Sequence, residues 1–82
     1  MYIDNRFFAN FLAKYSELEA ASDRIEDRME KAEAAGNAEK YQKLNQHDDR
    51  IISKMDGMTD VLMMLGYELR YQSGKPVIVE RG

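Results

Sequence analysis

Three consecutive residues, His47, Asp48 and Asp49, carry the side chains best suited to metal binding or proton transfer. Imidazole and carboxylate groups are common zinc ligands, but consecutive side chains on a helix point about 100° apart and cannot converge on one ion. His47 is the only histidine, the chain has no cysteine, and no other carboxylate is spaced to complete a site on that face. We therefore expect no metal ion and no cofactor.

Arrangements typical of catalysis are also missing from the sequence. It contains no glycine-rich phosphate loop, no serine or cysteine nucleophile placed with a base, and no evident pair of carboxylates in a cleft. The sequence thus predicts that the protein is not an enzyme. Asp48 is expected to pair with Arg24 or Arg28, or to face solvent, because an unpaired buried carboxylate is costly.

Basic residues form the first candidate binding site. When the chain is written in heptads with Phe8 and Tyr41 at position a, these residues occupy positions c and g of two helices. In an antiparallel helix pair the two g positions flank each other, so the basic side chains lie on one side. This predicted basic face contains Arg24, Arg28, Lys31, Lys40, Lys43, His47, Arg50 and Lys54.

The basic face has three interpretations. It can be a solvated surface with local ion pairs, such as Asp27 with Lys31 or Glu39 with Lys43. It can meet the acidic face of a second copy, because the acids of the first helix occupy positions b, e and f. It can also bind an external anion, namely RNA or DNA, a nucleotide, or an acidic protein surface. Only Tyr41 among the aromatic residues lies near these cations, which disfavours single-strand recognition by base stacking.

Two apolar stripes position these side chains, and each steps by alternating threes and fours, as a heptad seam does. The first consists of Phe8, Phe11, Tyr15, Leu18, Ser22, Ile25, Met29 and Ala32, and the second of Tyr41, Leu44, Asp48, Ile51, Met55, Met58, Leu62 and Leu65. The stripes are mirror images about the Gly36-Asn37 bond. Folding the chain there brings them into register, with Ser22 expected to face Ile51 and Asp48 to face Ile25.

The sequence predicts a mainly α protein, an antiparallel two-helix coiled-coil hairpin with a short C-terminal β-hairpin. Helices are expected at about 4–34 and 38–65, joined by a turn at 35–37. Asp4 is a candidate N-cap, with a hydrophobic staple from Ile3 to Phe8 across it. Gly57 interrupts the second helix, but the heptad phase continues past it, which favours one continuous helix.

The spacing of apolar residues changes after Gly66, from the three-four spacing of a helix to the alternation of a strand. Tyr67, Leu69 and Tyr71 alternate with charged residues, Ser73-Gly74 is a turn signal, and a β-branched run follows at 77–79. We expect a β-hairpin over about 67–80. A lone two-stranded hairpin is marginal in water, so it must pack on the helices or pair with another chain.

Length and composition describe one small domain. The chain has 82 residues and a net charge of −3, which disfavours a generally basic nucleic-acid binder. Neither end resembles a cleavable signal, and no apolar run approaches the roughly 20 residues that span a bilayer. The expected location is the cytoplasm, with no membrane partner.

Apolar residues outside the two stripes gather in the half of the hairpin away from the turn. They are Phe7, Leu12, Ile52, Val61, Met63 and Met64. This apolar surface is too wide for one partner helix to cover. The β-hairpin, a second copy or both can cover it; we expect both, and hence a homodimer or larger helical bundle. The alternative is a monomer in which the β-hairpin alone covers this surface.

The leading functional expectation is a small, non-enzymatic, homo-oligomeric binding protein. Its size and acidic, cysteine-free composition are typical of phage or mobile-element accessory proteins that bind and inhibit or regulate a host protein. One alternative is an anion binder that captures nucleic acid or a small nucleotide on the predicted basic face. Another is a purely structural oligomer without a ligand.

Overall fold

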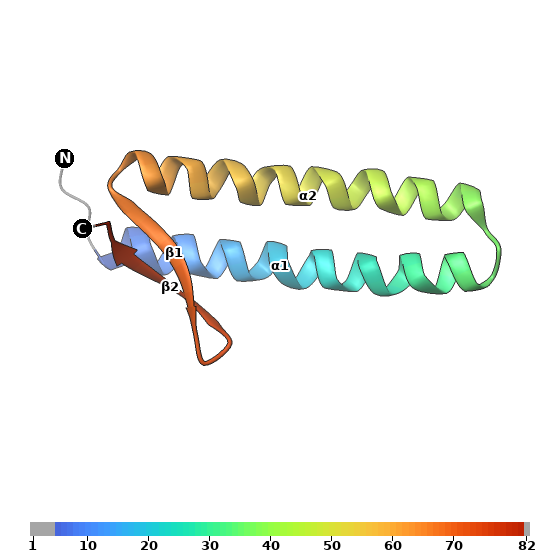
Figure 1. Cartoon of the computed structure of the whole chain (residues 1–82), viewed down its shortest axis with the longest axis horizontal. Coiled ribbons are helices and arrows are strands. Elements are labelled where there is room, and N and C mark those ends of the chain that lie inside the picture. Colours follow the sequence, from blue (N-terminus) through green and yellow to red (C-terminus); the bar gives the residue numbers. More distant parts are fainter. Residues whose placement is uncertain (1–4, 82) are drawn as a thin grey trace.

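The protein folds into a helical hairpin with a β-hairpin across one end (Figure 1). The structure, a computed structural model, describes residues 5–81. Helix α1 spans Asn5–Ala34, helix α2 spans Ala38–Met64, and strands β1 and β2 span Tyr67–Gln72 and Lys75–Glu80. The predicted hairpin, its turn and its β-hairpin are therefore confirmed, while assembly into a larger bundle stays a prediction. The proposed cap at Asp4 and its staple to Ile3 lie outside the described residues.

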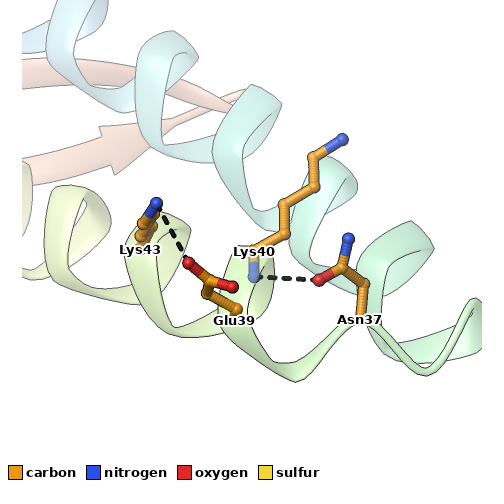
Figure 2. Close-up of polar contacts among 4 residues, drawn as sticks. All are labelled: Asn37, Glu39, Lys40 and Lys43. Carbon is orange, nitrogen blue, oxygen red and sulfur yellow. Dashed lines mark hydrogen bonds and ion pairs between the residues drawn. The ribbon is translucent and has the colours of Figure 1, made fainter.

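The turn between the helices is fixed by backbone chemistry. Gly36 has a φ of 70°, in the left-handed region that favours glycine. Its N–H donates to the carbonyl of Glu33, and the N–H of Asn37 donates to that of Ala32, at 3.0 and 2.9 Å. These two bonds form a Schellman motif, which ends α1. Asn37 then caps α2, because its Oδ1 accepts a 3.1 Å hydrogen bond from the backbone N–H of Lys40 (Figure 2).

The heptad seam is the core of the protein. All sixteen residues of the two predicted stripes are buried or half-buried. Phe11, Tyr15 and Leu62 form one buried cluster, and Leu18, Ile25 and Ile51 form another. Helix α2 runs through Gly57 without a break, as predicted, and ends one residue earlier than expected, with Leu65 as its cap.

The β-hairpin packs on the open end of the helix pair. Tyr67, Leu69 and Ile78 contact the cluster of Phe11, Tyr15 and Leu62. These three side chains share a face, because residue 67 pairs with 80 and residue 69 with 78 in the antiparallel register. The predicted turn is confirmed: Ser73 and Gly74 both have positive φ, 52° and 78°, as a two-residue hairpin turn of type I′ requires.

The molecule is elongated, measuring 50 × 24 × 21 Å. Its radius of gyration is 15.7 Å, whereas a compact domain of this length has about 12 Å. The β-hairpin crosses only the end beside the chain termini (Figure 1). A large part of the helix pair, including the turn half, therefore has no third layer.

Candidate binding groove

The two long sides of the helix pair differ in what covers them. On one side the Tyr71 hydroxyl of β1 donates a hydrogen bond to the Glu19 carboxylate of α1, where the β-hairpin lies over the helix. On the other side Lys14 of α1 lines an open groove. Because Glu19 and Lys14 are five residues apart, they point about 140° apart around α1. The groove and the β-hairpin therefore lie on different sides.

The open groove has an apolar floor with a lysine on each helix. Its volume is about 480 Å³, and it is lined by Phe11, Lys14 and Leu18 of α1 and by Lys54, Gly57, Met58 and Val61 of α2. The floor belongs to the core, because Phe11 and Leu18 are buried residues of its two clusters. Gly57 has no side chain, which leaves the groove wide at this position. A Cβ added to Gly57 would have no heavy atom within 4 Å, apart from those of the adjacent residues and the local helix backbone.

A second groove continues along the same side toward the turn. It has a volume of about 270 Å³ and is lined by Ala21, Arg24, Ile25, Arg28, His47 and Ile51. Ala21 occupies the same heptad position as Lys14, and His47 the same as Lys54, so both grooves lie along the flanking g positions. We call the two together the basic groove. Beside it, a concave surface on α2 adds Arg50, together with His47 and Lys54.

The cations of the protein are concentrated on this side. Eight of the twelve lysines and arginines belong to it: Lys14, Arg24, Arg28, Lys31, Lys40, Lys43, Arg50 and Lys54. Lys14, which the sequence analysis missed, occupies the same heptad position as Arg28. The net charge of the chain is −3, but Glu19, Glu26 and Glu33 occupy the opposite e positions of α1, which separates their negative charge from this side.

Local ion pairs neutralise only part of this charge. Lys31 lies 3.6 Å from Asp27, and Lys43 lies 3.4 Å from Glu39 (Figure 2), which confirms both predicted pairs. All four side chains are well exposed, so each pair contributes little to stability. Within residues 5–81, Arg24, Arg28 and Arg50 form no ion pair. These three guanidinium groups are available for an anionic partner.

The predicted apolar surface is divided between the two sides. Val61 lines the basic groove, and Phe7 shares its heptad position on α1. Ile52 and Met63 lie about 160–180° from Val61 around α2, on the side of the β-hairpin. They are 40 % and 44 % exposed, while Met64 is 84 % exposed and points outward. Leu12 is half-buried. The six residues therefore lie on more than one side of the helix pair, and their contact with a second copy or a partner stays a prediction.

The surroundings of Asp48 differ from those expected from the sequence. It does not reach Arg24 or Arg28, and it does not face solvent, because only 5 % of it is exposed. Instead the buried hydroxyl of Ser22 donates a 2.5 Å hydrogen bond to Asp48 Oδ1. The two polar seam residues thus satisfy each other. In an antiparallel coiled coil the side chains of one helix pack between those of the other. A seam residue can therefore contact a residue one layer away from its mirror-image partner.

The hydrogen bond between the Tyr71 hydroxyl and the Glu19 carboxylate holds the β-hairpin to α1. The hydrogen bond to the Glu19 carboxylate raises the pKa of Tyr71 above its usual value. Partial burial and the neighbouring Tyr15 hydroxyl raise it further. The hydroxyl therefore stays protonated to high pH and remains a donor to Glu19. This contact fixes the β-hairpin on the side away from the basic groove.

Among residues 5–81, no three histidine, aspartate or glutamate side chains gather so that they could hold a metal ion. In the same range, neither helix has an apolar stretch long enough to cross a bilayer.

Comparison with known proteins found no matching family model, no similar curated protein and no similar solved structure. The function is therefore inferred from the geometry of the chain itself.

Proposed function

We propose that this chain is a non-enzymatic binding protein and that the basic groove holds a partner with acidic and apolar side chains together. One observation carries the proposal: Lys14 and Lys54 border an open groove whose floor includes Phe11, Leu18 and Met58, and Arg24 and Arg28 line the groove that continues it. Neither feature alone implies a partner, because charged surfaces are usually solvated and single exposed apolar residues are common. Their combination along one continuous side is typical of a binding surface.

The two features have different roles in binding. The apolar lining contributes to the affinity chiefly through Met58 and Val61, because Phe11 and Leu18 are already buried. Removing apolar surface from water contributes about 25 cal/mol per Å². The cations select and attract an acidic partner, and they raise its association rate at low salt. The same cations repel one another across the g positions of the free protein, which costs stability. An acidic partner would remove this repulsion.

The expected inhibition or regulation of a host protein is one use of such a groove. A small chain can act by occupying a partner's acidic, apolar segment, without any chemistry of its own. The buried Asp48 supports a non-catalytic role, because its bond to Ser22 is internal to the helix seam. The only histidine, His47, lies among cations on the rim of the groove rather than beside a nucleophile.

The experiment uses a fluorescent peptide of leucine and glutamate, with polyglutamate of equal charge as its control. The protein variant Gly57→Leu places a side chain into the groove without changing the charge. It should fold, because Gly57 has open space at its Cβ and leucine favours a helix more than glycine does. The mixed peptide should bind the unmodified protein, and Gly57→Leu should weaken binding at least tenfold. Equal binding of polyglutamate, or no effect of the leucine, would refute the proposal.

A nucleic-acid backbone is the second candidate partner, and the turn half of the basic face favours it. Arg24 and Arg28 line the smaller groove there. Lys40 and Lys43 belong to the first turns of α2, close to the turn between the helices. This candidate predicts binding of duplex RNA or DNA that falls steeply with salt. It also predicts that Gly57→Leu has no effect, because phosphates do not need the apolar floor.

Charge-reversal variants distinguish binding at the basic groove from a general effect of the net charge of the protein. Both candidates predict that Arg28→Glu with Lys43→Glu weakens binding. The matched control is Lys75→Glu with Arg81→Glu, which changes the net charge equally on exposed residues in or just after the β-hairpin. If the control pair weakens binding as much as the first pair, the basic groove is not the binding site.

A further inference from the structure

The length of the basic groove sets the size of its occupant. On α1 the groove extends from Phe11 to Arg28, a difference of 17 residues, and on α2 from His47 to Val61, a difference of 14. At 1.5 Å per helical residue these spans are about 26 Å and about 21 Å. A helix of about 15 to 17 residues, or an extended strand of about 7 or 8, would fill this length.

The chemistry of the groove floor favours a helical partner segment over an extended one. Its surface is made of side chains, chiefly the apolar ones of Phe11, Leu18 and Met58. The backbone N–H and C=O groups beneath them are already used within α1 and α2. A strand in the groove would leave its own backbone groups facing an apolar surface without partners, which is costly. A helix satisfies its backbone groups internally and packs by its side chains alone.

The rims give the charge pattern of the occupant. Lys14, Arg24 and Arg28 border the groove on α1, while His47 and Lys54 border it on α2. Because cations lie along both rims, acidic residues are required on both flanks of the apolar stripe of the occupant. A stripe at positions i, i+3, i+4 and i+7 would face the floor.

A second copy of this chain fits the groove poorly. Its acidic residues lie mainly at positions b, e and f of α1, among them Glu26, Glu30 and Glu33. Nearby apolar side chains are seam residues such as Ile25 and Ala32, which are buried against α2. The exposed large apolar residues on that side of a copy are Ile52 and Met63 of α2, which are eleven residues apart. The acidic side of a copy therefore offers charge for the rims but only a sparse apolar stripe for the floor.

From these observations we infer that the partner segment is an acidic amphipathic α-helix of about 15 to 17 residues. It lies lengthwise in the basic groove and forms a third helix beside α1 and α2. This inference rests on the proposed function and adds the conformation, length and charge pattern of the partner. The hydrogen bond between Tyr71 and Glu19 places the β-hairpin on the side of the pair away from the groove, so the β-hairpin and a third helix do not compete.

The test compares three labelled 17-residue peptides by fluorescence anisotropy and circular dichroism. The first has leucines at helical spacing with glutamates on both flanks. The second has the same composition in strict alternation, as in a strand, and the third is the first with glutamine in place of glutamate. We expect the first to bind and gain helicity, with the second and third at least tenfold weaker.

The outcomes separate this inference from the function on which it rests. If the alternating peptide binds as tightly as the helical one, the proposed function stands and the helical partner is wrong. If no glutamate peptide binds, the proposed function itself fails. A protein whose mass in solution doubles without peptide, and returns to one chain in Gly57→Leu, would show that a second copy fills the groove. Competition with duplex nucleic acid gives a further outcome. If the duplex displaces the helical peptide, and if it binds the Gly57→Leu variant as tightly as the unmodified protein, the inference would also be overturned.

Discussion

The hydroxyl of Ser22 in α1 donates a 2.5 Å hydrogen bond to Oδ1 of Asp48 in α2, between two residues that are 7 % and 5 % exposed. This bond is the polar contact that joins the two helices inside an otherwise apolar seam. It fixes their register, because a shift of either helix would leave a buried carboxylate beside hydrocarbon.

The substitution Ser22→Ala should destabilise the protein by about 1–3 kcal/mol, because it removes the hydrogen-bond partner of a buried carboxylate. The double variant Ser22→Ala with Asp48→Leu replaces both partners by apolar groups and should recover most of this loss. Urea unfolding of the two single variants and the double variant gives the coupling free energy. Additive losses in the double variant would show that the two side chains do not interact.

The substitution Gly57→Ala should stabilise the protein by about 1 kcal/mol. Alanine favours a helix interior over glycine by that amount, and no atom blocks the new Cβ. The melting temperature should rise by about 4–8 °C for a chain of this size. Gly74→Ala is the matched control, because Gly74 has a φ of 78° that alanine adopts only with strain, and its melting temperature should fall.

The Tyr71 hydrogen bond should make the stability sensitive to alkaline pH. In the unfolded chain tyrosine ionises near pH 10, whereas the Glu19 carboxylate raises the pKa of Tyr71 in the folded protein. Its stabilisation is therefore complete below about pH 10 and is lost as the pH rises through the folded pKa. Tyr71→Phe should cost at most about 1 kcal/mol, because Tyr71 is half exposed, and should remove this component of the pH dependence.

Absorbance at alkaline pH provides an independent measurement of the same contact. The unmodified protein should contain one tyrosine that ionises later than the others, and this late step should be absent from Tyr71→Phe. Glu19→Gln removes the acceptor's charge and should move the late step toward the usual range. A titration curve unchanged by both substitutions would contradict the contact.

Self-association is expected through the side that carries Ile52 and Met63. Both are large apolar residues that remain over a third exposed after the β-hairpin has packed. Light scattering should give the mass of at least two chains, and Ile52→Lys with Met63→Lys should reduce it to one. Val61→Lys, on the groove side, serves as the control and should leave the mass unchanged. A mass of one chain for the unmodified protein would make the predicted homo-oligomer wrong.

Local sequence determined most of the secondary structure. The three-four spacing of the two stripes specifies two helices, and Gly36-Asn37 provides the backbone signals that end α1 and cap α2. Ser73-Gly74 fixes the β-hairpin in the same way, through two residues with positive φ. These features depend on neighbours within a few residues, so the sequence alone is sufficient to place them.

Heptad labels also predicted which side would carry the cations. An angle around a helix follows directly from residue number, and the g positions of two antiparallel helices must flank each other. The labels placed Arg28 and Lys54 on the same side of the helix pair, and Lys14 could have been added by the same rule. They also show that Ile52 and Val61 point to opposite sides of α2, a distinction that the sequence analysis did not use.

Only the tertiary structure decided which side the β-hairpin covers and therefore which side stays open. The side on which the strands lie involves contacts between distant residues: Tyr71 with Glu19, and Tyr67 with Phe8. The bond between Ser22 and Asp48 depended in the same way on how side chains interlock across the seam. Periodicity gives each side chain a direction, but the energies of packing and hydrogen bonding between distant segments decide what it meets there.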